Sequence, residues 1–166
     1  MGNSETLQLT TPTEREIVMT RLFDAPRSLV FDALTRPELL KRWYGPRGWA
    51  LAVCDIDLRV GGAYRFVSRR PDGKDIGQRG VYREIVRPER IVHTESWEDW
   101  DAGEVLVTAV LVEQGGKTTL TSTALYPSRE VRDILMKSGM QRGASETYDR
   151  LAEMLASRSG TAQESA

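Results

Sequence analysis

The sequence has 166 residues, of which 40% are hydrophobic and 28% charged, a composition typical of one globular domain that excludes a disordered or fibrous chain. Its 23 Lys and Arg nearly balance 24 Asp and Glu, so a net charge of -1 provides no field to attract nucleic acid or an anionic membrane. A single cysteine, Cys54, excludes an internal disulfide, and no Cys or His cluster has the spacing of a metal site. We therefore expect a cytoplasmic protein with no metal, no cofactor and no integral membrane association.

Polar and small residues dominate both ends of the chain. Residues 1–13 and 158–166 contain few large apolar groups, so ordering them would bury little surface, and both are predicted to be disordered tails. The first residues also lack the basic-then-apolar pattern of a signal peptide, and no apolar run is long enough to span a bilayer. Residues 14–157 are therefore interpreted as a single domain.

One strand and two short helices are predicted at the start of this domain. Residues 14–23 predict the strand because apolar side chains recur at every second position. Pro26 suits the first turn of a helix, and the residues after it recur at helical spacing. Thr35 and Glu38 then have the spacing of a capping box, which predicts a second short helix through Trp43.

Short alternating runs separated by turn residues fill the middle of the chain and predict six strands. Connections this short join antiparallel neighbours, so the six strands form a meander. In the strand over residues 76–86 the inner face is left open, because Tyr82 and Glu84 compete for it with Val81 and Ile85. The six strands are expected at residues 50–59, 63–70, 76–86, 90–98, 104–113 and 117–125.

Two helices complete the domain. Ser128 is placed to cap a short helix over residues 131–137, and a longer amphipathic helix follows to about residue 157. An amphipathic helix that follows a meander buries its apolar stripe on the sheet, because each element covers what the other would expose. These elements predict an α+β fold whose curved antiparallel sheet wraps around the long C-terminal helix.

Several segments, taken with this order of elements, resemble one family. Together they resemble bacterial proteins similar to the C-terminal domain of Aha, the activator of the heat-shock chaperone ATPase, within the START-like (SRPBCC) superfamily. The resemblance covers about residues 14–157 and implies a helix-grip fold with an internal cavity between the sheet and the last helix. It implies no single function, because this superfamily carries transport, sensing, chaperone partnering and catalysis on one scaffold. The segments are Phe23-Asp24-Ala25-Pro26, Leu40-Lys41-Arg42-Trp43-Tyr44-Gly45-Pro46, Asp57-Leu58-Arg59-Val60-Gly61-Gly62 and Ser138-Gly139-Met140.

The implied cavity is expected to have aromatic walls that grip an apolar or aromatic ligand. Methionines on the last helices fit a loosely packed pocket better than Leu and Ile would. The alternative is ordinary core packing, which is the commoner role of methionines on a helix stripe and is expected for at least half of the aromatic residues. The predicted ligand-binding residues are Trp43, Tyr64, Phe66, Tyr82, His93, Glu95, Trp97, Met136 and Met140.

The strand over residues 90–98 carries the candidate catalytic residues. His93, the only histidine of the chain, and Glu95 share one strand face by the two-residue period. If both point inward, burial raises the pKa of Glu95 while each charge favours ionisation of the other group, and the pair can exchange a proton near neutral pH. The alternative is that both lie near an edge, where water or neighbouring polar side chains satisfy them.

Three functions are compatible with these features. The first is a binding, carrier or sensor domain for a small hydrophobic or aromatic ligand. The second is a polyketide-cyclase-like or hydrolase-like enzyme that uses His93 and Glu95, and the third is a protein-interaction module or chaperone co-factor. The binder ranks first because the sequence has no Walker loop, nucleophile elbow or dinucleotide motif. A homodimer or a protein partner stays open as an alternative.

Overall fold

The computed structural model describes residues 5–165, which form eight strands and four helices. One antiparallel sheet contains every strand, in the order β1-β2-β8-β7-β6-β5-β4-β3. The elements are β1 (Gln8–Thr10), β2 (Glu16–Phe23), α1 (Arg27–Thr35), α2 (Pro37–Trp43), β3 (Ala50–Ile56), β4 (Ala63–Arg69), β5 (Asp75–Val86), β6 (Arg90–Trp97), β7 (Val105–Gln114), β8 (Lys117–Leu125), α3 (Arg129–Lys137) and α4 (Met140–Ser165).

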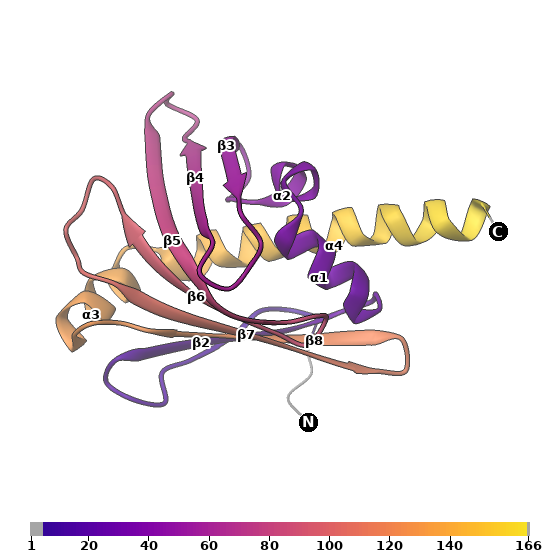
Figure 1. The fold of residues 1–166 in the computed structure, drawn as a ribbon, viewed down its shortest axis with the longest axis horizontal. Coiled ribbons are helices and arrows are strands. Elements are labelled where there is room, and N and C mark those ends of the chain that lie inside the picture. Colours follow the sequence, from indigo (N-terminus) through magenta and orange to yellow (C-terminus); the bar gives the residue numbers. More distant parts are fainter. Residues whose placement is uncertain (1–4, 166) are drawn as a thin grey trace.

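The sheet curves around α4, which crosses its concave side and projects beyond it at the C-terminal end (Figure 1). Strands β3 to β8 form the predicted meander, and β2 pairs with β8 along its whole length, so the first long strand closes against the last. The α+β helix-grip architecture expected from the sequence is confirmed. No helix among residues 5–165 is long and apolar enough to cross a membrane.

Both ends of the domain extend further than expected. β1 pairs with β2 inside the predicted N-terminal tail, and Leu9 explains this because its side chain packs against a buried cluster around Ile17. Helix α4 continues to Ser165, where a tail from residue 158 was predicted, and no proline interrupts that stretch. The remaining parts of the predicted tails, residues 1–4 and 166, lie outside the described residues.

Helix α2 begins differently from the capping box predicted for it. The hydroxyl of Thr35 donates to the carbonyl of Phe31, 2.8 Å away, so it satisfies its own helix α1. The N-cap of α2 is Arg36, with no side-chain cap, and Glu38 accepts a hydrogen bond from the Arg36 side chain instead. The capping-box prediction was therefore wrong, because buried Thr35 is the last residue of the preceding helix.

The inner face of β5 changes parity along the strand. The register with β6 shifts between Tyr82 and Glu84, so one extra residue bulges out of the ladder there. Tyr82 on one side of the bulge and Ile85 on the other therefore both pack against the buried core. The parity of Tyr82 is therefore the inner one before the bulge, and the parity of Ile85 is the inner one after it.

The interior contains two apolar clusters. The larger joins β2 and the inner faces of β3 to β8 with α1, α2 and the second half of α4, and includes Phe31, Leu40 and Leu151. The smaller surrounds Ile17 and Tyr126 and is covered by α3 and the start of α4. These two clusters fill the space on either side of the candidate site.

Candidate functional site

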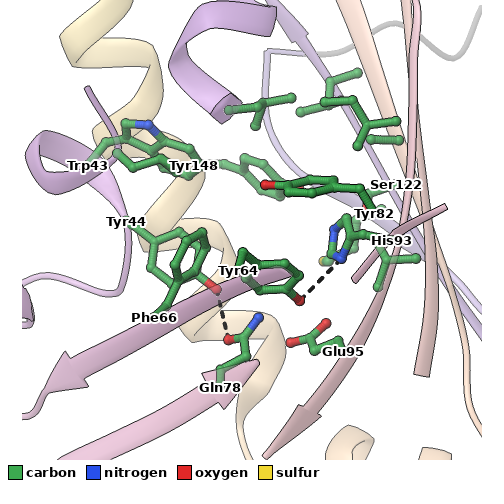
Figure 2. A pocket seen from close by; sticks show the side chains of 17 residues that line it. Trp43, Tyr44, Tyr64, Phe66, Gln78, Tyr82, His93, Glu95, Ser122 and Tyr148 are labelled. Atoms are coloured by element: carbon green, nitrogen blue, oxygen red, sulfur yellow. Dashed lines mark hydrogen bonds between the residues drawn. The ribbon is translucent and has the colours of Figure 1, made fainter. Parts of the chain in front are cut away.

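A pocket of about 250 Å³ lies inside the fold, and its lining residues come from both apolar clusters. Helices α1, α2 and α4 and six strands of the sheet contribute side chains to it (Figure 2). The lining residues are Met19, Leu34, Leu40, Trp43, Tyr44, Tyr64, Phe66, Gln78, Tyr82, Ile91, His93, Glu95, Val107, Ala109, Leu120, Ser122 and Tyr148.

Aromatic rings in contact with one another form much of the wall. The Tyr44 and Phe66 rings meet edge to face with their centroids 5.1 Å apart, and Tyr64 lies 5.0 Å from Phe66 and 5.6 Å from Tyr82. Edge-to-face and tilted contacts of this kind hold aromatic side chains in fixed orientations. The ring cluster therefore presents a preformed aromatic surface to whatever occupies the pocket.

His93 is fixed by a triangle of polar atoms. The Tyr64 hydroxyl donates to the carbonyl of Thr94 at 2.7 Å, and Nδ1 of His93 lies 3.2 Å from that hydroxyl oxygen and 3.1 Å from the same carbonyl. A hydroxyl has one proton, so this geometry assigns the ring proton to Nδ1, which donates to both oxygens. The other ring nitrogen, Nε2, is then left as a hydrogen-bond acceptor.

The surroundings of His93 favour its neutral form. Burial lowers the pKa of His93, and the hydrogen bond to the Thr94 carbonyl only partly offsets this effect. Among the described residues, no carboxylate forms an ion pair with the ring. Near neutral pH His93 is therefore an uncharged acceptor on the pocket wall.

Glu95 is the one carboxylic acid among the described residues of the pocket wall. Among the side chains and backbone amides that the structure describes, none donates a hydrogen bond to its carboxylate, and Figure 2 shows the group pointing into the pocket with no dashed line to any neighbour. Desolvation raises the pKa of Glu95 to about 7, so its partial exposure is to the pocket and not to bulk water. The carboxyl group therefore keeps its proton to a higher pH than an exposed glutamate does.

Gln78 supplies a hydrogen-bond donor to the same pocket. Its Oε1 accepts from the Tyr44 hydroxyl at 3.0 Å, so its amide nitrogen remains as a donor. The charge of Glu95 also acts on nearby phenols, since it helps raise the pKa of Tyr44 and of Tyr148, the latter to about 12. The pocket therefore combines aromatic walls with hydrogen-bonding groups from β5 and β6.

His93 and Glu95 both line the pocket, but they do not act as the pair that the sequence suggested. No hydrogen bond or ion pair joins them, and neither affects the pKa of the other. Burial moves both groups toward their neutral forms, because it disfavours each charge without bringing the opposite one close. The expected mutual ionisation was therefore wrong.

Six of the nine predicted ligand-binding residues lie in the pocket wall, and three lie elsewhere. Trp97 packs on Trp100, with ring centroids 5.3 Å apart, at the end of β6. Met136 and Met140 pack against the smaller apolar cluster under α3. The helix break at Gly139, whose φ is +80°, places Met136 on α3, whereas Met140 is the first residue of α4, about two turns before Tyr148. Their placement in the cavity wall was therefore a wrong expectation.

Several pocket residues were missed from the sequence. Gln78 shares the parity of Tyr82 along β5, so the alternative in which Tyr82 faces inward also places Gln78 inward. Tyr148 lies on the amphipathic helix predicted to run to about residue 157, and Tyr44 belongs to a family segment, but neither was named as a ligand-binding residue. Ser122 gave no signal, because it stands in a Thr- and Ser-rich strand.

Metal binding finds no support in the part of the chain that the structure describes. No group of three or more His, Cys, Asp or Glu side chains is placed there to hold a metal ion. Cys54 is a buried free cysteine on β3, and burial raises the pKa of its thiol to about 11. Its thiol is therefore protonated and unreactive at neutral pH.

The chain matches a known family along most of its length. A family model described as Activator of Hsp90 ATPase homolog 1-like protein matches residues 24–156. That segment begins directly after β2 and ends within α4. No curated protein matches the sequence.

Solved structures show the same fold. A protein from Rhodobacter sphaeroides is 32% identical, with a TM-score of 0.86 over 92% of this chain and 99% of that chain. A protein from Nitrosomonas europaea is 25% identical, with a TM-score of 0.81 over 90% and 99%. An AHSA1 protein from Silicibacter pomeroyi, at 20% identity, shares the fold with a TM-score of 0.71 over 86% and 99%.

Proposed function

The chain belongs to the family of Activator of Hsp90 ATPase homolog 1-like proteins, and we propose that it binds a small aromatic or otherwise apolar molecule in the pocket beneath α4. The observation that carries this proposal is Glu95, a carboxyl group in an aromatic pocket with no protein donor. Buried polar groups in native proteins are nearly always hydrogen-bonded. A ligand that enters the pocket supplies the missing partner.

The size of the pocket limits what it can hold. A cavity of about 150 Å³ is enough for benzene, and this pocket is about 250 Å³. It therefore suits a molecule of one or two rings with a short substituent, and is too small for a diacyl lipid. Mostly apolar walls with a few convergent polar groups are the usual composition of such sites.

The test compares two substitutions on neighbouring positions of β7. Ala109 lines the pocket, whereas Val110 points to the opposite face of the sheet. A thermal-shift screen of one- and two-ring fragments should find ligands that stabilise the wild type and the Val110→Phe variant but not the Ala109→Phe variant. Equal shifts for both variants, or no stabilising fragment at all, would contradict the proposal.

An enzyme is the second candidate, favoured by the ionisation of Glu95. A group whose pKa is near the working pH is suited to general acid–base catalysis, and the pKa of Glu95 is about 7. In this version Glu95 acts without His93, since the two do not interact. Once the screen has identified a ligand, the Glu95→Gln variant should still bind that ligand but no longer convert it to product. A ligand that stays unchanged after incubation with the wild-type protein would contradict the enzyme hypothesis.

A further inference from the structure

Resting on the proposed function, we propose that the ligand is an organic cation: a protonated aryl-alkyl amine whose ring contacts the aromatic wall and whose ammonium group binds the Glu95 carboxylate. Three features of the pocket lead to this class. They are the charges of the wall, its aromatic surface, and the hydrogen-bonding atoms that the protein leaves free.

The charges of the wall exclude an anionic ligand. No Lys or Arg is among the described residues that line the pocket, and Glu95 is the one group there that carries a charge near neutral pH. A ligand carboxylate or phosphate would meet this carboxyl group with no cation to offset the repulsion. An ammonium group meets an opposite charge that lacks a partner.

The aromatic wall adds a second attraction for a cation. Tyr44, Tyr64, Phe66, Tyr82 and Tyr148 line the pocket together with Trp43, and the faces of such rings attract cations through their quadrupoles. Aromatic cages of this kind are used to bind ammonium groups. The same rings pack against the hydrocarbon part of an aryl-alkyl amine, so one wall serves both parts of the ligand.

The free hydrogen-bonding atoms favour an ammonium group that still carries protons. Nε2 of His93 accepts a hydrogen bond because Nδ1 is engaged with Tyr64 and Thr94, and Glu95 accepts when ionised. Both groups project into the pocket from the same face of β6 (Figure 2). Two acceptors from one strand face match the several N–H donors of a primary ammonium group. A neutral alcohol has one donor and gains less.

Binding of such a cation is coupled to a proton on Glu95. The titratable groups whose interactions reach Glu95 are Tyr44, Tyr64, Tyr126 and Tyr148, all phenols with raised pKa values that stay neutral. His93 also stays neutral, because burial lowers its pKa. Glu95 is therefore the group that changes charge, and the ammonium group displaces its proton at acidic pH.

The experiment uses three probes with one carbon skeleton: 3-phenylpropan-1-amine, 3-phenylpropan-1-ol and 3-phenylpropanoate. By isothermal titration calorimetry at pH 8, the amine should bind wild type about 30-fold more tightly than the alcohol, from a cation–π and ion-pair gain of about 2 kcal/mol. Its affinity should fall about tenfold at pH 6, where most Glu95 is protonated. At pH 6, titrations of the amine in two buffers of different ionisation enthalpy should show that Glu95 releases about one proton on binding.

Two variants separate the charge from the fold. Glu95→Gln keeps the shape of the side chain and should remove the preference for the amine while the alcohol still binds. Glu104→Gln removes an exposed carboxylate at the start of β7 and should bind all three probes as wild type does. If the alcohol or the propanoate binds wild type as tightly as the amine, the cation proposal is overturned and the pocket remains a binding site. If none of the three binds, both this inference and the proposed function are overturned.

Discussion

Tyr64 on β4 lies opposite Gly80 on β5 in the sheet register, and its ring occupies the space into which a side chain at position 80 would project. A Cβ atom at Gly80 would be 2.6 Å from Cε1 of Tyr64 and would collide with the carbonyl oxygen of Thr94. That carbonyl is the one to which Tyr64 and His93 are both hydrogen-bonded. Gly80 thus permits the polar triangle that orients the pocket histidine.

Gly80→Ala should therefore destabilise the fold by about 3 kcal/mol, because the clash involves backbone of β6 that cannot rotate away. Urea unfolding measures this effect. Gly143→Ala is the matched control: an added Cβ there meets only Pro46 Cγ, at 3.3 Å, and alanine favours the helix by about 1 kcal/mol. Equal losses of stability for both variants would show that the contact with Tyr64 and Thr94 is not the cause.

Glu95→Gln should stabilise the unliganded protein at alkaline pH and leave it almost unchanged at acidic pH. The pKa of Glu95 is about 7 in the fold against an ordinary value of 4.5, so the unfolded chain loses its proton first and wild-type stability falls between those values as pH rises. Above pH 7 the full difference is roughly 3 kcal/mol. Urea unfolding at pH 4.5 and pH 8 checks this, and a gain that is the same at both pH values would contradict the burial of Glu95.

His93 should stay uncharged at pH values at which an exposed histidine is already protonated, because its pKa is lowered. Burial lowers its pKa, so the unfolded chain binds a proton first as pH falls, and stability drops below about pH 6.5 from this group. Because His93 is the only histidine in the sequence, one imidazole resonance reports it by NMR. We expect nitrogen shifts of a neutral ring with the proton on Nδ1 at pH 6.5. A charged ring or the Nε2–H tautomer at that pH would be incompatible with the triangle around Thr94.

Arg150 should be important for the loop that follows α2 beside the pocket. Its guanidinium donates to the carbonyls of Gly45, at 2.8 Å, Pro46, at 3.2 Å, and Arg42, at 3.3 Å, which ties the loop to α4. Arg150→Ala should cost roughly 2 kcal/mol in unfolding free energy, since these hydrogen bonds are to a charged donor. Arg142→Ala, about two turns before Arg150 on α4 and with a side chain that is 89% exposed, should cost almost nothing.

The order of the elements could be predicted because it depends on local patterns. Strand alternation and turn residues placed β3 to β8 within a few residues, and Ser128 caps α3 as expected, accepting from the Val131 amide at 3.2 Å. The amphipathic pattern of the last helix also predicted that its apolar stripe lies on the sheet, where Leu151 is buried. These features follow from the period of each element and need no knowledge of distant contacts.

The pocket was harder to predict, because its walls depend on irregularities that have no local signal. The bulge between Tyr82 and Glu84 resets the parity of β5. The break at Gly139 puts Met136 on a separate helix, and Met140, at the start of α4, packs with it against the smaller cluster. Trp97 has the same parity as Glu95, yet at the strand end it packs on Trp100. The parity of a residue in a strand predicts which face of the sheet its side chain lies on. Whether that side chain also lines the pocket depends on where the residue lies along the strand.

The most direct test of the account is a crystal structure of the protein soaked with 3-phenylpropan-1-amine at pH 8. We expect the phenyl ring among Tyr44, Phe66 and Tyr82 in the pocket beneath α4, with the ammonium nitrogen within hydrogen-bond distance of the Glu95 carboxylate. An empty pocket at saturating probe, or an amine bound only on the outer surface, would contradict it.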